Sequence, residues 1–476
     1  MRFITNKNTN FYYDEESQTA NEFIQDTYAT KANSILWWFN HEKQNWENDL
    51  IDTNCIEFIQ KFLPDKKPSY VSNVYKKVRA FATETPETVY TAPTVFLNNW
   101  KYEFINGKWE FDNQDITNFN QFLIKIPTDN IDETEKYENI VLVPEKQELE
   151  RFINLLWPDP EIREWALANY ATAFMPQSFE KIIFNYGQGR DGKSTVATLL
   201  SNILKHLSSS FYLNDNDKFA MANFPGKTLM VDNDFDANQT LTLDVIKHKT
   251  TKGSVEVENK NKDKKTIYNR TTLMVNSNFL PKFNDISNAT ERRLNIVLFE
   301  NSMETNPDDD WFTLSETEEL LQNKNFQYLF VVRCLQAFAN LYNEQNGEIR
   351  KPKKIEEITK EVCEKNNMIY SFLYQKDIVA SLKTWGELNL TTLYDTYSLW
   401  CCENSIQQKQ AKRNFNQSVQ IVLLNKFKIR TNKIEIKKHD VFEVKLIDID
   451  FKPVAEAKTE TNKIEENKEL VLNEVK

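Results

Sequence analysis

The residues with the clearest chemical potential in this sequence are a cluster of glycines followed by a lysine and two hydroxyl side chains. Only 8 of the 476 residues are glycine, so three within six positions mark a place where the backbone approaches another group closely. The spacing is G-x-x-x-x-G-K-[ST], which predicts a loop that binds nucleoside triphosphate phosphates. Lys193 would reach the β- and γ-phosphates, and Ser194 would bind Mg²⁺. The segment reads Gly187-Gln188-Gly189-Arg190-Asp191-Gly192-Lys193-Ser194-Thr195.

The sequence on both sides of this loop predicts the strand and the helix that such a loop needs. Residues 182–184 are an apolar run, which is typical of a buried strand. A helix that begins at the loop would point its N-terminus at the phosphates, so a chance match in a surface turn is the weaker interpretation. The apolar residues after the loop recur at helical spacing: Val196, Leu199, Leu200, Ile203, Leu204 and Leu207.

Two carboxylates follow a second strand-like run, residues 229–231. We expect this acidic strand to lie beside the strand of the glycine-rich loop. One carboxylate would hold the Mg²⁺ shell and the other would orient the attacking water. We assign Asp232 to the metal and Asp234 to the water, although the intervening Asn233 leaves room for a shift of one position. The alternative is an acidic turn after a core strand.

A polar amide and an arginine pair come later in the chain. Asn278 follows the apolar run 273–275 and is our candidate for sensing the γ-phosphate, with Asn276 as the fallback. Arg292 and Arg293 precede another apolar strand, from which an arginine can act on the γ-phosphate of a neighbouring subunit. The alternative for the amide is an ordinary strand end followed by a turn. The alternative for the arginine pair is two solvated side chains at the start of a strand.

A basic segment lies between the acidic strand and the amide. Residues 247–282 contain nine lysines and arginines but only three acids. Valines alternate with glutamates before a polar, lysine-rich stretch, and residues typical of a strand follow it. This pattern predicts a β-hairpin with a basic tip. Such a tip is suited to nucleic-acid phosphates; a solvated charged loop is the alternative. The candidate DNA-binding residues here are Lys252, Lys260, Lys262, Lys264 and Lys265.

These motifs, in this order and within 107 residues, resemble those of the superfamily 3 helicases, which are AAA+ motors of viruses, phages and mobile elements. The resemblance is greatest to the branch of poxvirus and satellite-phage primase–helicases, where the loop reads G-x-G-x-N-G-K-S-T. This chain has Asp191 in place of the usual Asn, and Asn261 in place of the aromatic residue between two hairpin lysines. It is also similar to the Rep proteins of staphylococcal pathogenicity islands.

The resemblance implies an ATP-dependent DNA helicase that replicates a phage, plasmid or pathogenicity island. Subunits would form a ring, expected to be a hexamer, with ATP and Mg²⁺ between neighbours and Arg292 or Arg293 supplied in trans. The ring would translocate 3′→5′ on single-stranded DNA, recognise an origin duplex, and work with host replication proteins. Two other classes stay open: an initiator that uses ATP only as an assembly switch, and a non-motor P-loop enzyme such as a small-molecule kinase.

We therefore expect an α/β fold: an AAA+ P-loop core with a mainly helical N-terminal domain and a C-terminal winged-helix domain. The predicted parts are a helicase-associated collar (1–130), the superfamily 3 ATPase domain (131–345), a winged helix-turn-helix domain (355–450) and a disordered tail (451–476). Residues 409–445 carry ten lysines and arginines against three acids, which favours DNA binding over protein docking. The candidates there are Lys412, Arg413, Lys437 and Lys438.

Composition sets the remaining limits. The net charge of −11 excludes a uniformly basic surface, so any nucleic-acid contact must be local. The five cysteines include no C-x-x-C pair, which predicts reduced thiols. The four histidines are scattered along the chain, so we expect no zinc site. No apolar run is long enough for a membrane helix, and no secretory signal begins the sequence, so we expect a cytoplasmic protein without a membrane partner.

The basic tip makes a testable prediction. Replacing Lys260 and Lys262 with alanine should weaken affinity for single-stranded DNA and its stimulation of ATP turnover, because two phosphate contacts are lost. Fluorescence anisotropy and an ATPase assay would measure this, with Lys463→Ala, Lys468→Ala in the predicted tail as the control pair. Unchanged affinity and turnover would reject the role of the hairpin.

Overall fold

The computed structural model divides the chain into two units, residues 1–367 and 368–476. Each unit is described by itself. The structure describes residues 14–446 apart from 33–34, 43–44, 50–51, 86–87, 116–119, 141–142, 214–219, 236–239, 242, 258–264, 284–287, 366–367, 381–386, 405–410, 428 and 437–438.

The centre of the first unit is a five-stranded parallel sheet with the strand order β15-β7-β13-β9-β8. Its four longer strands are almost wholly buried, as expected for a parallel sheet that is covered on both faces. The fold is thus mixed α/β, as predicted. The strands are β7 (Ile182–Gly187), β8 (Ser208–Ser210), β9 (Leu229–Asp232), β13 (Thr272–Ser277) and β15 (Leu294–Phe299).

The strand order corrects one expectation. The acidic strand β9 does not lie beside β7, because β13 runs between them and pairs with both. Sequence proximity does not determine which strands become neighbours when helical crossovers separate them. Since all five strands are parallel, the ends of β7, β13 and β9 still meet at one carboxyl edge of the sheet.

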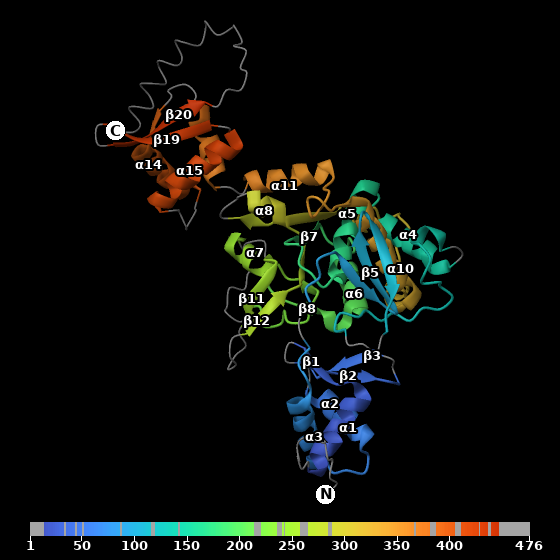
Figure 1. The fold of residues 1–476 in the computed structure, drawn as a ribbon. Coiled ribbons are helices and arrows are strands. Elements are labelled where there is room, and N and C mark those ends of the chain that lie inside the picture. The colour runs from blue at the N-terminus through green and yellow to red at the C-terminus, as the bar shows by residue number, and fades with distance from the viewer. Residues whose placement is uncertain are drawn as a thin grey trace. The chain divides into compact units, whose positions relative to one another are not determined.

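Helices surround this sheet in the first unit (Figure 1). Trp165 anchors α5 to β15, because its indole nitrogen donates to the Ile296 carbonyl over 2.7 Å. Arg333 of α10 is ion-paired with Glu164 of α5. Of the described helices, none is long and apolar enough to cross a membrane. The helices are α4 (Pro144–Leu156), α5 (Pro160–Ala171), α6 (Lys193–Leu204), α8 (Asn288–Arg293), α9 (Leu314–Gln322), α10 (Lys324–Leu341) and α11 (Lys353–Lys365), with short 3₁₀ turns at Tyr137–Asn139, Thr172–Phe174 and Lys205–Leu207.

The predicted hairpin arms are confirmed. Two antiparallel strands pair from Gly253 opposite Asn269 to Val257 opposite Lys265. The helix α7 leads directly into the first arm, and the tip lies outside the described residues. The elements here are α7 (Leu243–Thr250), β11 (Gly253–Val257) and β12 (Lys265–Asn269), with the two-residue pairs β10 (Thr240–Leu241) and β14 (Lys282–Phe283), and β16 (Tyr342–Asn343) and β17 (Glu348–Ile349).

The N-terminal part of this unit is mixed in the described residues 14–115, with three helices and six strands, rather than mainly helical as predicted. The sheet β4–β6 shares the main buried cluster with the central sheet, so this cluster runs through the predicted boundary at residue 131. Residues 20–82 form separate, smaller clusters. The elements are α1 (Glu15–Thr27), β1 (Thr30–Ala32), β2 (Ile35–Asn40), β3 (Asn45–Asn48), α2 (Asp52–Phe62), α3 (Pro68–Phe81), β4 (Thr94–Leu97), β5 (Trp100–Ile105) and β6 (Lys108–Asn113).

The second unit packs its helices around its own buried cluster, in which Tyr397 stacks on Phe415 with ring centroids 4.4 Å apart. A helix followed by two antiparallel strands appears here, as the sequence predicts. The predicted tail lies outside the described residues. The elements are α12 (Met368–Gln375), β18 (Glu387–Asn389), α14 (Leu390–Glu403), α15 (Lys412–Phe427), β19 (Ile429–Ile436) and β20 (His439–Leu446).

Because the second unit has a buried cluster of its own, we predict that a chain ending at Asn367 folds by itself. The main buried cluster of this shorter chain should unfold in a cooperative urea transition, which circular dichroism would follow. A chain ending at Arg350 is the control, since it lacks Ile355 and Val362, which are buried in the main cluster. The control should lose roughly 3 to 6 kcal/mol of stability for two buried aliphatic side chains. Equal midpoints for the two chains would contradict this division.

Candidate functional site

The glycine-rich loop, residues 187–192, connects β7 to α6 and is shaped by its glycines. A Cβ atom on Gly187 would lie 2.6 Å from the Phe299 carbonyl oxygen of β15. Gly192 has φ of +88°, and a Cβ there would lie 2.3 Å from Leu156. Both positions therefore exclude other residues, because the backbone is left-handed or the space is already filled. The loop holds its shape through packing against neighbouring elements.

The centre of the loop holds a carboxylate in a cage of donors. Asp191 is buried, and its Oδ2 lies 2.5 Å from the ammonium of Lys193. The N–H groups of Gly189 and Lys193 point at the same carboxylate over 3.2 and 3.4 Å. Lys193 also donates to the Gly187 carbonyl oxygen over 3.0 Å. Backbone donors, a buried ammonium and the N-terminus of α6 thus already bind an anionic group, which is the chemistry that phosphate requires.

The other residues of the predicted loop site are more accessible. Gln188, Arg190 and Ser194 are exposed, and Thr195 is half-buried at the start of α6. Arg190 adopts φ of +48°, and its carbonyl accepts from the Met303 N–H over 3.1 Å. The loop is therefore bonded to the segment after β15, while Ser194 is exposed at the start of α6.

The two acids after β9 have different surroundings. Asp232 is buried, and its oxygens accept from the N–H groups of Leu213 (2.7 Å) and Asp234 (3.1 Å). Burial raises the pKa of the Asp232 carboxyl. Asp234 is exposed. Asp232 is thus held rigidly by backbone donors, whereas Asp234 is the carboxylate that an incoming water or ion would meet.

Next to these acids, a row of amides crosses the carboxyl edge of the sheet. Asn276 of β13 donates to Asn233 over 2.7 Å and accepts from Asn185 of β7 over 2.8 Å. The hydroxyl of Tyr170 donates to the other end of this row, the Asn185 oxygen, over 2.8 Å. The favoured sensor, Asn278, is exposed beyond the end of β13, whereas the fallback Asn276 is in the row.

Our sequence reasoning did not include Asn185 or Tyr170 in the site. The signal for Asn185 was an amide inside an otherwise apolar strand, since a buried amide needs partners. Asn233 was interpreted as an interruption between two acids. In the structure its side chain binds the neighbouring strand.

Mg²⁺ is the metal that the motif implies. In the part of the chain that the structure describes, no group of three His, Cys, Asp or Glu side chains could hold a metal ion. Mg²⁺ is usually bound through one or two protein oxygens, water and substrate phosphates. Exposed Ser194, beside the anion-binding loop, fits this role, and Asp232 and Asp234 lie at and just after the end of β9 on the same carboxyl edge of the sheet.

The arginine pair lies at the opposite edge of the sheet. Ile182 of β7 pairs with Leu294 of β15, directly after the arginines, and Gly187 pairs with Phe299 at the other end. Six residues at about 3.3 Å each place Arg292 and Arg293 roughly 20 Å from the glycine-rich loop of the same chain. Neither side chain can therefore contact a phosphate that this loop binds.

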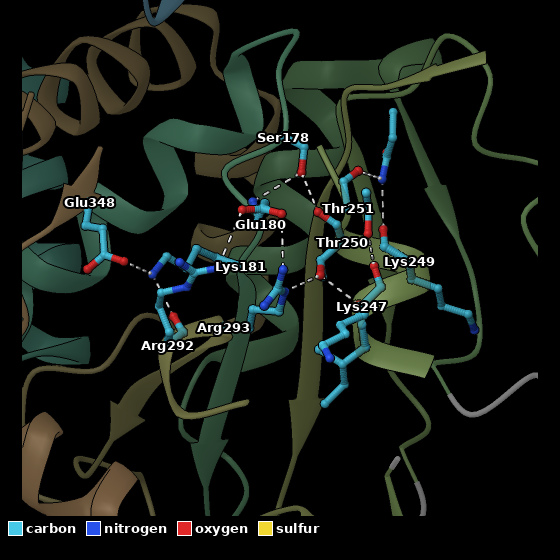
Figure 2. Close-up of polar contacts among 12 residues, drawn as sticks. Ser178, Glu180, Lys181, Lys247, Lys249, Thr250, Thr251, Arg292, Arg293 and Glu348 are labelled. Carbon is cyan, nitrogen blue, oxygen red and sulfur yellow. Dashed lines mark hydrogen bonds and ion pairs between the residues drawn. The ribbon is translucent and has the colours of Figure 1, made fainter. Parts of the chain in front are cut away.

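The guanidiniums of both arginines lie near Glu180, but the two side chains differ in exposure (Figure 2). The side chain of Arg292 is 52% exposed, whereas that of Arg293 is 9% exposed and is ion-paired with Glu180 over 3.1 Å. Arg292 lines a cavity of about 990 Å³. The other cations that line this cavity are Lys181, Arg350, Lys351, Lys353 and Lys360.

The predicted DNA-binding residues are only partly described. Lys252 is exposed between α7 and β11, and Lys265 begins β12. Lys412 and Arg413 are exposed at the start of α15. Lys260, Lys262, Lys264, Lys437 and Lys438 lie outside the described residues.

Comparison with known proteins finds one family model, a family of unknown function (DUF5906), which matches residues 185–293. No curated protein matches. Three apo structures of the NrS-1 C-terminal region are similar at 11%, 14% and 12% identity, with TM-scores of 0.47, 0.46 and 0.49. They cover 91%, 90% and 92% of this chain and 100% of their own chains. The family match spans under a quarter of the chain, so function rests on the site itself.

The caged carboxylate predicts the effect of one substitution. Asp191→Asn should tighten binding of ADP about tenfold, because a negative charge no longer competes with phosphate for Lys193 and the loop donors. Isothermal titration calorimetry on the full chain would measure the dissociation constant.

The matched control is Asp49→Asn. Asp49 is also a buried aspartate in an ion pair, and its partner is Arg79. The control should leave the ADP affinity at the wild-type value even if stability falls. Equal affinities for wild type and Asp191→Asn would show that the carboxylate does not compete with phosphate.

Proposed function

We propose that this chain is an ATP-dependent DNA helicase of the superfamily 3 type that works as a ring. Its glycine-rich loop would be a P-loop that binds the phosphates of ATP. The observation that carries the proposal is the separation of the two charged half-sites: an anion-binding loop at one edge of the sheet and an exposed arginine at the other.

Two separated half-sites support assembly from head to tail. If Arg292 completes a nucleotide site, that site must belong to another copy of the chain, because its own loop is roughly 20 Å away. Repeating the same contact from copy to copy is a heterologous interface, which closes into a ring when the rotation permits. A hexamer is the ring that the resemblance to superfamily 3 helicases implies.

The cavity around Arg292 is suited to the phosphates of a neighbour's ATP. Six lysines and arginines line it, together with Glu291, Glu348, Glu356 and Glu357. The guanidinium of Arg292 would match phosphate oxygens in a fork and stabilise the charge of the transition state. We therefore assign the trans role to Arg292 and leave Arg293 a structural position inside the protomer.

Within one protomer, the residues would divide the work at the carboxyl edge of the sheet. Lys193 would hold the phosphates after leaving Asp191, and Asp234 would orient the attacking water. Asn276 donates to Asn233, which lies between the two acids. It is therefore better placed than the exposed Asn278 to hold Asp232 and Asp234 in position. Mg²⁺, when bound with the nucleotide, would neutralise phosphate charge, with Ser194 as its candidate ligand.

Two basic parts of the chain support DNA as the polymer that is moved. The paired arms β11 and β12 are joined by the lysine-rich segment 258–264, whose composition suits contacts with a single strand. In the second unit, α15 is followed by the antiparallel β19–β20 pair, and Lys412 and Arg413 are exposed at the helix start. This helix and strand pair would act as the recognition helix and wing of a winged-helix module. We assign origin recognition to this unit and 3′→5′ movement on single strands to the hairpins.

A mixing experiment tests the trans arginine. Arg292→Ala should lower ATP turnover about a thousandfold or more, the range for an arginine finger. The double variant Asp191→Asn, Lys193→Ala should also be inactive; its first substitution avoids leaving a buried unpaired carboxylate when the lysine is removed. Mixed in equal amounts, the two should regain turnover, because roughly a quarter of the head-to-tail seams combine an intact loop with an intact arginine.

The control for this experiment is Lys353→Ala. Lys353 lines the same cavity and is 87% exposed, so this change removes a charge from the same face. It should keep near-normal turnover. A mixture no more active than its separate components would refute catalysis across subunits. Light scattering that shows a monomer with ATP and single-stranded DNA would refute the ring, and ring assembly without strand separation would instead favour an ATP-switched initiator.

A further inference from the structure

The buried arginine of the pair has a position that the proposed function does not use. Arg293 lies directly after Arg292, but its guanidinium is directed into the protein (Figure 2). One carboxylate serves both residues: Glu180 is 3.1 Å from the Arg293 guanidinium and 3.8 Å from that of Arg292. A group that engages Arg292 therefore competes with Glu180 and changes the charge balance at Arg293.

Glu180 itself is held in an unusual conformation. Its φ of +56° lies in the left-handed region, which side chains other than glycine rarely adopt. Its N–H donates to the hydroxyl of Ser178 over 3.2 Å, and that hydroxyl donates to the Thr250 carbonyl over 2.9 Å. Such a conformation persists only where surrounding contacts determine it, so the position of Glu180 depends on this cluster.

Another bond of Arg293 leads to the hairpin. Its Nε donates to the hydroxyl of Thr250 over 3.2 Å. Thr250 is the last residue of α7, and β11 begins at Gly253. The second arm returns to the same point, because the buried amide of Asn269, at the end of β12, donates to the carbonyls of Lys249 (2.9 Å) and Thr251 (3.1 Å). Both ends of the hairpin are therefore bonded around Thr250.

The same turn of α7 is also connected to the acidic strand β9, through the segment that contains Tyr212 and Leu213. Lys249 is buried, and its ammonium donates to the carbonyl oxygens of Tyr212 (2.8 Å) and Leu213 (2.7 Å). Leu213 in turn donates its N–H to Asp232. The last turn of α7 thus has bonded connections to the acid of the protomer's own site on one side and to the arginine pair on the other.

From this arrangement we propose that the last turn of α7, residues 249–251, transmits nucleotide state to the β11–β12 hairpin. Arg293 is the positioning residue through which the nucleotide of the neighbouring subunit acts on this turn. This inference rests on the proposed function. A phosphate beside Arg292 draws that guanidinium from Glu180, Glu180 then binds Arg293 alone, and Arg293 shifts Thr250 and the hairpin base. Because coupling is reciprocal, DNA on the hairpin alters nucleotide affinity by the same factor.

The test is the effect of nucleotide on DNA affinity. The full chain would bind a fluorescent oligo(dT) with and without Mg²⁺ and a non-hydrolysable ATP analogue, followed by anisotropy. In the wild type, the analogue should change the dissociation constant about fivefold or more. Thr250→Val removes the hydroxyl that accepts from Arg293 and should reduce this factor to below about twofold, with DNA affinity in the absence of nucleotide unchanged.

Two matched controls separate coupling from loss of stability. Thr27→Val removes a buried hydroxyl that bonds the carbonyl four residues earlier, as Thr250 also does. Arg293→Lys keeps the charge beside Glu180 but loses the fork that reaches Thr250, and Arg333→Lys makes the same change at another buried arginine–glutamate pair. Thr250→Val and Arg293→Lys should lose the nucleotide effect, and both controls should keep it.

Each outcome decides the inference. If Thr250→Val and Arg293→Lys retain the wild-type factor, the inference fails while the proposed function stands. If Thr250→Val loses DNA affinity without nucleotide as well, Thr250 only supports the hairpin and coupling through it is rejected. If the wild type shows neither a nucleotide effect on DNA binding nor DNA-stimulated ATP turnover, the proposed function and the inference fail together.

Discussion

The parallel ladder between β7 and β15 is the constraint on which the other features of the site depend. Six consecutive residue pairs connect the strands, from Ile182–Leu294 at one edge to Gly187–Phe299 at the other. The ladder brings the Phe299 carbonyl so close to Gly187 that only glycine fits there. It also keeps the arginine pair at a set distance from the loop. A nucleotide site that uses both ends of this ladder must therefore be shared between copies of the chain.

The carboxyl edge of the sheet is polar and partly buried, and its buried polar groups bind one another or their neighbours. Lys193 pairs with Asp191, and the amides of Asn185, Asn276 and Asn233 bind in a row. Breaking a buried pair or leaving an amide without partners costs several kcal/mol, so this edge is held in one arrangement. A phosphate that replaces the Asp191 carboxylate would use donors that are already oriented, which lowers the cost of binding.

On our proposal, the opposite edge would convert this binding into movement. Glu180, Arg293 and Thr250 form a compact set of charged and hydroxyl groups at the base of the hairpin. Because a carboxylate shared by two arginines responds when one of them finds another anion, a small change at the protein surface can be carried inward. Rigid bonds around Thr250 then apply that change to both hairpin arms rather than to one.

The sequence by itself determined the features that depend on neighbouring residues: the glycine-rich loop with its strand and helix, the two arms of the hairpin, and the helix and strand pair of the second unit. Turn residues and periodicities of 2 and 3.6 express these locally. Only the tertiary structure decided that β13 separates β7 from β9, that Arg293 is buried beside exposed Arg292, and that Asn276 rather than Asn278 joins the amide row. Strand order and burial arise from contacts between residues far apart in the chain, and adjacent residues with the same side chain carry no sign of which one the packed protein encloses.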